Sequence, residues 1–397
     1  MTWADAALLV LSLPVVVACG YLLLLTLLSA SKPAPPQVAA QLKFDLIVPA
    51  HNEEGGIGRT VANLSALDYP VALRRILVVA DNCEDATAAC AREAGATVLE
   101  RHDTQNRGKG FALAHAFEHS LKEGFADAVV VVDADTVVSS HLLHSFGLRL
   151  QAGAHAVQAH YGVLNPMASW RTRLMAIALA LFHKVRSMGR ERLGVSCGLR
   201  GNGMCFSHRV IREVPHDAFS IVEDLEYGIR LGRAGHRVHY AWEAEVLGEM
   251  VSSEKAARSQ RRRWEGGRWA MTKQFGVPLL GEALRKRDGV LLDLAMDLLV
   301  PPLSYVVLGA VAVAVAASGL SVWQGRVAAS SWAASFCMAS LGLYVLRGWW
   351  VSGMGARGLV DLMRAPFYVA WKVWLMVAGP RDKKGEWVRT TREARKP

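Results

Sequence analysis

Three long apolar segments frame a charged middle region in this sequence. Residues 6–28 are almost wholly apolar, with Pro14 and Gly20 as breaks, and two further apolar runs cover 298–320 and 327–346. Each run is long enough to span a bilayer. The chain is 52% apolar yet 20% charged, which is too apolar for an ordinary soluble enzyme. We therefore expect an enzyme domain held between membrane segments.

The termini indicate how these segments are oriented. Residues 1–5 contain no Lys or Arg, so residues 6–28 predict an anchor rather than a cleaved signal peptide. A fourth apolar stretch, 359–378, contains charged residues and several aromatics, which is typical of an interfacial helix. The basic residues before and after that stretch favour the cytoplasmic side. We expect an outside amino terminus, a cytoplasmic catalytic domain and a multi-pass protein of the inner or plasma membrane.

The resulting domain organisation has five parts. Residues 1–30 form the amino-terminal anchor, 31–43 a proline-containing linker, and 44–285 the cytoplasmic catalytic domain. Residues 286–350 hold two membrane helices, and 351–397 an interfacial helix with a basic cytoplasmic tail. A homo-oligomer would help if so few crossings had to form a pore.

The net charge indicates which partners the protein binds, and the cysteine spacing indicates the state of its thiols. The net charge of +10 comes with no base-reading helix or RNA-stacking motif, so anionic lipid headgroups are expected rather than nucleic acid. The six cysteines form no CxxC pair, which favours reduced thiols over a disulfide or zinc framework.

The first half of the middle region alternates between strand and helix patterns. Strands are predicted at 44–49, 75–80, 96–99 and 128–132, and helices at 57–67, 85–94 and 108–121. This order predicts an α/β fold with a mostly parallel sheet covered on both faces. Farther on, we expect a helix over 170–193, a glycine-rich loop with a strand edge over 196–206, a helix starting near residue 223, and a strand at 236–241.

Two carboxylates follow the valine-rich strand that ends near Val132. If the strand continues, Asp133 and Asp135 point the same way at its carboxyl end, where open α/β sheets bind ligands. Oxygen ligands of this kind suit Mg²⁺ or Mn²⁺ shared with a substrate phosphate. A strand followed by an Asx turn is an equally good interpretation of these residues alone.

Further polar groups follow other elements. Glu53 and Asp81 come after the first two strands, and helix capping explains their convergence on one sheet edge poorly. Lys109 opens a helix where an anion could bind, although a solvated turn fits as well. Glu223 and Asp224 could divide the work of a general base and its support, or could simply begin a helix. Residues 260–264 read Gln-Arg-Arg-Arg-Trp, and membrane-surface charge accounts for the arginines but not for the flanking Gln and Trp.

Taken in order, the motifs PAHNEE, DNCEDAT, NRGKG, DADT, VED and QRRRW cover residues 45–264. This series resembles the membrane-bound inverting family-2 glycosyltransferases. That group includes cellulose, chitin-oligosaccharide and hyaluronan synthases and ceramide glucosyltransferase. The resemblance implies a GT-A type catalytic domain that transfers a hexose or N-acetylhexosamine from a nucleotide sugar, typically UDP-linked. The acceptor would be a hydroxyl of a polysaccharide or a lipid.

The resemblance also implies a role for each matched residue. Glu53 and Asp81 would hold the uridine, with Lys109 near it. Asp133 would face the nucleotide and Asp135 would bind Mg²⁺ or Mn²⁺. Asp224 would be the general base, beside Glu223. The diphosphate and acceptor would meet Gln260, Arg263 and Trp264. Departing UDP accumulates negative charge, which a divalent ion and arginines stabilise.

The sequence departs from the processive synthases in that family. No FxVTxK gating sequence follows residue 264, and only about three crossings are predicted. Either Cys197-Gly198 or Gly201-Asn202-Gly203 could lie near the acceptor. We favour exopolysaccharide synthesis, with ceramide or diacylglycerol glycosylation as the alternative.

Two rival classes fit less well. Asp133 and Asp135 also match the DxDx[TV] strand end of haloacid dehalogenase-like phosphatases, but that family places it on the first strand and has a later GDxxxD, which is absent here. A non-catalytic scaffold that binds lipid or nucleotide would have no need of Asp224 or Trp264.

Overall fold

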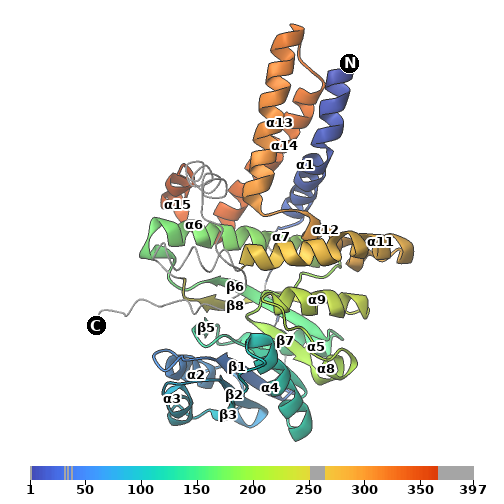
Figure 1. The fold of residues 1–397 in the computed structure, drawn as a ribbon. Helices are drawn as coiled ribbons and strands as arrows, with labels where there is room; N and C mark the ends of the chain where they lie inside the picture. Colours follow the sequence, from blue (N-terminus) through green and yellow to red (C-terminus); the bar gives the residue numbers. More distant parts are fainter. Residues whose placement is uncertain (1, 31–32, 34, 37–38, 251–263, 365–397) are drawn as a thin grey trace.

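A helical bundle stands on an α/β domain in the computed structural model (Figure 1). The structure describes residues 2–30, 33, 35–36, 39–250 and 264–364. The amino terminus lies at the far end of the bundle, and the α/β domain lies at its base. All six cysteines are free thiols, as expected.

The first half of the domain is a parallel sheet. Its strands are β1 (Phe44–Ala50), β2 (Arg74–Asp81), β3 (Thr97–Arg101) and β4 (Ala128–Val131), in the spatial order β3-β2-β1-β4. All three pairings among them are parallel. The connecting helices are α2 (Ile57–Ser65), α3 (Thr87–Glu93) and α4 (Lys109–Glu123). The strand and helix predictions for this half are confirmed, because β-branched runs and helical periodicity are local signals.

The second half makes the eight-stranded sheet mixed. Beyond β4 the order continues β7-β6-β8-β5. Strand β7 (Met204–Ser207) runs antiparallel to β4 and to β6 (Ala156–Val163), and β8 (Val238–Gly248) runs parallel to β6. The short β5 (Thr136–Val138) pairs antiparallel with β8. The sheet is therefore less parallel than predicted, because its later strands are joined by loops and return connections rather than by repeated strand-helix crossovers.

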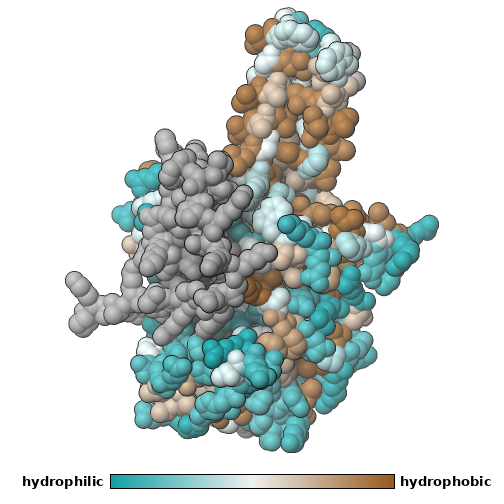
Figure 2. Space-filling view, in the orientation of Figure 1, coloured by the Kyte–Doolittle hydropathy of each residue, from teal (hydrophilic) through white to brown (hydrophobic). Residues whose placement is uncertain are grey.

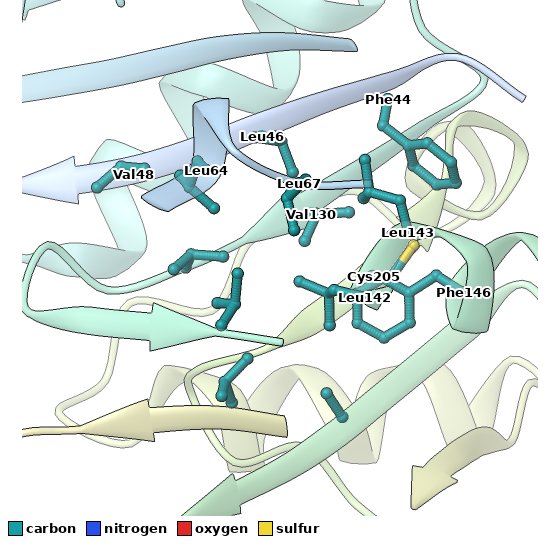
Figure 3. Packing of buried hydrophobic residues seen from close by; sticks show 14 of the residues in the cluster. Phe44, Leu46, Val48, Leu64, Leu67, Val130, Leu142, Leu143, Phe146 and Cys205 are labelled. Carbon is teal, nitrogen blue, oxygen red and sulfur yellow. The ribbon is translucent and has the colours of Figure 1, made fainter. Parts of the chain in front are cut away.

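The sheet has an apolar core on each face. One core includes Leu46, Val48 and Val130 with residues of α2 and of α5 (Leu142–Gln151), and Figure 3 shows this packing. The other core includes Ile47 and Val79 with α4 and other elements. Neighbouring residues of β1 thus enter opposite cores, so both faces of the sheet are covered. The ends of its strands are left to bind a ligand.

The bundle consists of α1 (Trp3–Leu27), α13 (Leu303–Gln324) and α14 (Ser330–Ser352), and α1 packs against both others. Among the described residues, α1 and α13 are long and apolar enough to cross a membrane. The membrane crossing predicted at 327–346 forms helix α14, but α14 does not meet the criterion of length and apolar composition that α1 and α13 meet. Asp5 accepts hydrogen bonds from the amides of Ala329 and Ser330 and so joins α1 to the start of α14.

A layer of helices lies between the bundle and the sheet (Figure 1). The helix predicted over 170–193 is confirmed as α6 (Trp170–Leu179), a π-helical turn η3 (Ala180–Val185) and α7 (Arg186–Arg192). The helix predicted from residue 223 is α9 (Glu223–Arg233). The beginning of the predicted interfacial segment is described up to residue 364 and includes α15 (Gly355–Leu362), while the rest of that segment and the tail lie outside the described residues. The remaining elements are η1 (Val71–Leu73), η2 (Pro166–Ala168), α8 (His208–Glu213), a helical stretch at 264–271, η4 (Thr272–Gly276), α11 (Val277–Lys286) and α12 (Gly289–Leu299).

Candidate active site

The two aspartates after β4 lie in a turn rather than on the strand. Strand β4 ends at Val131, and the amide of Thr136 donates to the carbonyl of Asp133 over 3.2 Å. The expectation that Asp133 and Asp135 alternate along an extended strand is therefore wrong. The turn lets the chain reverse from β4 into β5, and it holds the two carboxylates at the carboxyl end of the parallel half of the sheet.

A buried asparagine fixes this turn. Asn202 accepts a hydrogen bond from the amide of Asp133 through Oδ1 at 3.1 Å and donates from Nδ2 to Oγ1 of Thr136 at 2.8 Å. Asn202 has no exposed surface, so both of its polar groups depend on these partners. The sequence marked residues 201–203 only as one of two candidate acceptor segments and did not predict that Asn202 would hold this turn.

Lys109 joins three parts of the site. Its Nζ lies 2.5 Å from Oδ1 of Asp133, 2.5 Å from the carbonyl oxygen of Gly201 and 3.9 Å from Oε1 of Glu223. Burial alone would lower the pKa of Lys109, but the charges of the surrounding carboxylates outweigh it and raise that pKa. The lysine therefore remains a cation in the centre of the site.

Glu223 and Asp224 begin α9 beside this lysine. Burial raises the pKa of Glu223 to about 7, and the neighbouring carboxylates Asp224 and Asp133 add to the rise while Lys109 opposes it. Burial raises the pKa of Asp224 as well. A carboxyl group with a raised pKa is a stronger base once ionised, so this pair can accept a proton at neutral pH.

The backbone at Gly201 lies directly against Asp224. A methyl group added at Gly201 would lie 3.4 Å from Oδ2 of Asp224, and Gly201 has a φ of +77° that side chains disfavour. The segment from Cys197 to Gly203 thus contacts Asp224 at Gly201 and holds the Asp133 turn at Asn202. Two segments were considered for the acceptor, Cys197-Gly198 and Gly201-Asn202-Gly203. The second lies against Asp224, the residue that the family resemblance implies as the base.

A second group of residues surrounds the ends of β1 and β2. Oδ1 of Asp81 accepts hydrogen bonds from Arg101 Nη1 at 2.7 Å and from Asn82 Nδ2 at 3.0 Å. The backbone amide of Glu53 donates to Thr87 Oγ1 at 2.7 Å. This hydrogen bond connects the loop after β1 to the start of α3. Arg101 was not predicted, since its contact with Asp81 forms only when β3 pairs with β2.

Left-handed asparagines shape both loops. Asn52 and Asn82 have φ values of +55° and +50°, which asparagine tolerates better than most residues. Their side chains accept from the amides of Glu84 at 2.8 Å and Asp103 at 2.9 Å, respectively. These bonds fix the loops that follow β1, β2 and β3 relative to one another, so the sheet edge presents a rigid set of polar groups.

The predicted site residues fall into three sets. Lys109, Asp133, Glu223 and Asp224 are brought together by α4, the turn after β4 and the start of α9. Glu53 lies after β1 and Asp81 ends the neighbouring parallel strand β2, and Asp135 is half-buried in the turn. Gln260 and Arg263 lie outside the described residues, while Trp264 is half-buried at the start of the 264–271 helix.

The carboxylates of the turn suit a hard divalent cation. Within the described ranges, no three His, Cys, Asp or Glu side chains cluster as a self-sufficient metal site. That fits Mg²⁺ or Mn²⁺, which bind through one or two carboxylates and complete their coordination with water and substrate phosphates. Asp133 and Asp135 are oxygen donors of the right kind, so the residues present fit a metal held jointly with a diphosphate.

The arrangement of these side chains indicates which kind of substrate the site can bind. Parallel strands ending in carboxylates, a lysine at a helix start and an acidic pair, of which Glu223 is buried and Asp224 half-buried, form a site for an activated, phosphate-bearing substrate on a mixed α/β sheet. The family model for "Glycosyltransferase like family 2" matches residues 40–267, which is more than half of the chain. The chain belongs to this family.

Curated relatives agree with this assignment. The chain is 26% identical over 242 residues to a "Probable glycosyltransferase YdaM" of Bacillus subtilis, covering 59% of this chain and 57% of that protein. It is 29% identical over 247 residues to a beta-monoglucosyldiacylglycerol synthase of Synechocystis, covering 58% of this chain and 50% of the relative. The chain therefore matches about half the length of these curated relatives.

A solved structure shares the fold over nearly the whole chain. The mannosyltransferase PcManGT of Pyrobaculum calidifontis, determined with GDP-Man and Mn²⁺, superposes with a TM-score of 0.52 at 18% identity. The match covers 92% of this chain and 98% of that one. This likeness supports the GT-A type fold, as the motif resemblance implied.

Proposed function

We propose that the protein transfers a hexose or N-acetylhexosamine from a nucleotide sugar to an acceptor hydroxyl at a membrane, with inversion at the anomeric carbon. The observation that carries the proposal is the Glu223-Asp224 pair, with Glu223 buried and Asp224 half-buried, beside Lys109 and Asp133. It provides a base with a raised pKa next to a cation and to carboxylates suited to a metal diphosphate.

In the proposed reaction, each group of the site has one role. Asp224 accepts the proton of the acceptor hydroxyl while the acceptor oxygen forms a bond to the anomeric carbon. The bond between that carbon and the diphosphate oxygen breaks on the opposite face, and the electron pair leaves with the nucleoside diphosphate. Lys109 provides positive charge near that leaving group. A bound Mg²⁺ or Mn²⁺, held by Asp135, would neutralise the departing diphosphate, and Asp133 would face the nucleotide.

Donor binding is assigned to the strand-end loops. Glu53 lies in the loop after β1 and Asp81 is the last residue of β2, where a nucleoside would bind at the carboxyl end of a parallel sheet. We propose UDP as the nucleotide. Gln260, Arg263 and Trp264 are proposed to meet the diphosphate and the acceptor.

A lipid is the acceptor that the relatives favour. Beta-monoglucosyldiacylglycerol synthases from three cyanobacteria are 29% identical to this chain. The bundle of α1, α13 and α14 would hold the site next to a bilayer, with the catalytic domain in the cytoplasm. We therefore favour glycolipid synthesis over exopolysaccharide synthesis. The similarity to two probable glucomannan 4-beta-mannosyltransferases of rice supports exopolysaccharide synthesis as the second candidate.

The test uses the full chain reconstituted in vesicles. Radiolabelled UDP-glucose, UDP-galactose and UDP-N-acetylglucosamine are supplied with diacylglycerol or ceramide, and product is divided into lipid-extractable and polymeric fractions. We expect label in the lipid fraction. Label only in polymer would favour the second candidate, and no transfer from any nucleotide sugar would overturn the proposal.

Asp224→Asn provides the matched control. It keeps the size of the side chain but removes the base, so transfer should fall at least ~100-fold while binding of the UDP-sugar measured by calorimetry is retained. Transfer at the wild-type rate would show that Asp224 is not the base.

A further inference from the structure

Four arginines lie between the helical bundle and the catalytic site. Arg186 and Arg190 belong to α7, Arg200 belongs to the segment before β7, and Arg268 belongs to the helical stretch before η4. Three of them surround the ring of Phe182 in η3, with guanidinium carbons at 4.2 Å (Arg200), 4.9 Å (Arg186) and 5.5 Å (Arg268) from its centre. One aromatic ring thus holds three cations close together. We call the four arginines the arginine cluster.

The arginine cluster carries more positive charge than its acidic partners neutralise. Those partners are Asp293 and Asp297 of α12. Arg190 pairs with Asp293 at 2.6 Å, and two other members of the cluster pair with Asp297. Arg200 forms no ion pair in the part of the chain that the structure describes. Four cations therefore face two carboxylates, and the excess charge lies where water cannot easily compensate it.

Three buried N–H groups of the cluster have no hydrogen-bond acceptor among the described residues. They are Nε of Arg186, Nη2 of Arg190 and Nε of Arg200. These residues are only 5%, 0% and 8% exposed, respectively. A buried donor on a charged group is costly when it lacks an acceptor. The excess charge and the unfilled donors together indicate an anion, and the fork of N–H groups on a guanidinium suits the oxygens of a phosphate.

The arginine cluster lies on the side of the catalytic site that faces the bundle. Tyr21 of α1 donates to Asp293, a partner of the cluster, and η3 packs on α14. Figure 1 shows α7 and α12 between the bundle and the sheet. In Figure 2 the brown apolar surface of the bundle rises above the largely teal surface of the α/β domain. The cluster thus lies between the sheet and a bilayer that surrounds the bundle.

Arg200 connects the cluster to the proposed base. Its side chain lies on Phe182, while the next residue, Gly201, lies against Asp224 and accepts a hydrogen bond from Lys109. The positive charge of Arg200 also opposes the rise in the pKa of Asp224 that burial causes. An anion bound by Arg200 would therefore lie close to the acceptor hydroxyl that Asp224 deprotonates.

We propose that the arginine cluster binds a phosphate group of the acceptor, and so selects a phosphate-bearing lipid with a free hydroxyl over a neutral lipid such as diacylglycerol. This inference rests on the proposed function, whose acceptor it specifies. The donor diphosphate is assigned to the metal at Asp135 and to Lys109, so the phosphate at Arg200 is a separate one. One lipid would supply both the phosphate at the cluster and the hydroxyl at Asp224.

Acceptor competition in the full chain tests the proposal. The protein is reconstituted in phosphatidylcholine vesicles that contain equal amounts of diacylglycerol and phosphatidylglycerol, whose headgroup has free hydroxyls. Radiolabelled UDP-sugars are supplied, and the labelled lipids are separated by chromatography. Because both acceptors share one surface, attraction of the basic protein to anionic vesicles cannot change the ratio of products. We expect most of the label in the phosphatidylglycerol product.

Arg200→Gln tests the cluster itself. The ratio of phosphatidylglycerol product to diacylglycerol product should fall about tenfold or more, which is the loss expected for one charge-assisted hydrogen bond. Arg200→Lys keeps the charge without the fork and should give an intermediate ratio. Arg74→Gln is the matched control, because Arg74 is also buried but donates to the backbone carbonyls of Ser65 and Tyr69. It should keep the wild-type ratio. A ratio from one preparation does not depend on how much of the protein is folded.

The other outcomes overturn the inference at different points. Equal labelling of the two lipids, or a preference for diacylglycerol, would overturn it and leave the proposed function intact. An unchanged ratio in Arg200→Gln with a higher KM for the UDP-sugar would assign the cluster to the donor diphosphate. Faster transfer to both lipids on addition of inorganic phosphate, with no preference between them, would assign it to free phosphate. Label only in polymer would overturn the lipid acceptor as well, and no transfer at all would overturn the proposed function.

Discussion

Tyr21 in α1 donates a hydrogen bond of 2.8 Å to Asp293 in α12, although the two residues are 272 positions apart in the chain. Asp293 in turn accepts from Arg190 at 2.6 Å, and Arg190 donates from Nη1 to the carbonyl oxygen of Cys197 at 3.2 Å. Cys197 begins the segment that reaches Gly201 and Asn202. The first apolar helix is thus connected to the candidate active site through a short series of buried polar contacts.

Tyr21→Phe should weaken this connection. The change leaves one oxygen of a buried carboxylate without its hydroxyl partner, at a cost of about 1–3 kcal/mol. We expect a lower midpoint of thermal unfolding and a severalfold lower kcat, with a smaller change in the KM for the donor. Steady-state kinetics and thermal unfolding in the same detergent measure both effects.

Tyr344→Phe is the matched control for that variant. Tyr344 also belongs to the bundle and donates its hydroxyl to the carbonyl of Leu181 at 3.1 Å, but it does not contact Asp293. It should lose comparable stability and keep its kcat. If the two variants lose activity equally, the contact at Asp293 has no separate effect on the site.

Asn202→Ala should reduce activity more than its effect on stability suggests. The change removes both hydrogen bonds that hold the turn between Asp133 and Thr136, at a cost of about 2–4 kcal/mol. Because the turn carries the proposed metal-binding carboxylates, we expect kcat/KM to fall at least ~100-fold. Asn63→Ala removes a similar pair of bonds, to the amide and carbonyl of Val138, and should cost stability with little loss of kcat/KM. Equal losses in both variants would contradict a special role for Asn202.

The stability of the protein should depend on the ionisation of Glu223. Burial raises the pKa of Glu223 to about 7 from its ordinary value of 4.5, so the folded state binds the proton more tightly than the unfolded state does. The stability contribution of this group is therefore present at low pH and is lost as pH rises from about 4.5 through 7, by on the order of 2 kcal/mol. The midpoint of thermal unfolding should fall between pH 5 and pH 8 and should fall less in Glu223→Gln. An identical pH dependence in that variant would show that Glu223 does not titrate in this range.

Removal of divalent metal should abolish sugar transfer. A divalent ion at a departing diphosphate stabilises the transition state by several kcal/mol, so EDTA should lower the rate at least ~100-fold. Added Mn²⁺ or Mg²⁺ should restore it in the wild type. In Asp135→Asn, restoration should need a much higher metal concentration, whereas Asp217→Asn, at an exposed carboxylate on the surface, should behave as the wild type. Full activity in EDTA would contradict the metal assignment.

Local patterns were sufficient for the parallel half of the fold. The β-branched runs at 44–50, 74–81 and 128–131 formed adjacent strands because their residues fill a core on either face whatever their neighbours are. The three-residue β5 was not predicted, because a strand this short is decided by the strand that pairs with it. Strand β7 was expected only as a strand edge of the loop at 196–206, and its pairing with β4 and β6 was not.

By itself, the sequence determined the residue types of the site and the order in which they occur: carboxylates after apolar strands, a lysine at a helix start and an acidic pair at another. Only the tertiary structure decided which of them meet. Lys109 reaches Asp133 and Gly201 because α4, the turn after β4 and the segment before β7 meet in the fold, and residues of α4 and of that segment share one core. Contacts such as Asp81 with Arg101 and Tyr21 with Asp293 join residues whose separation along the chain carries no signal. The raised pKa of Glu223 likewise depends on burial, which a chain acquires only when distant segments exclude water together.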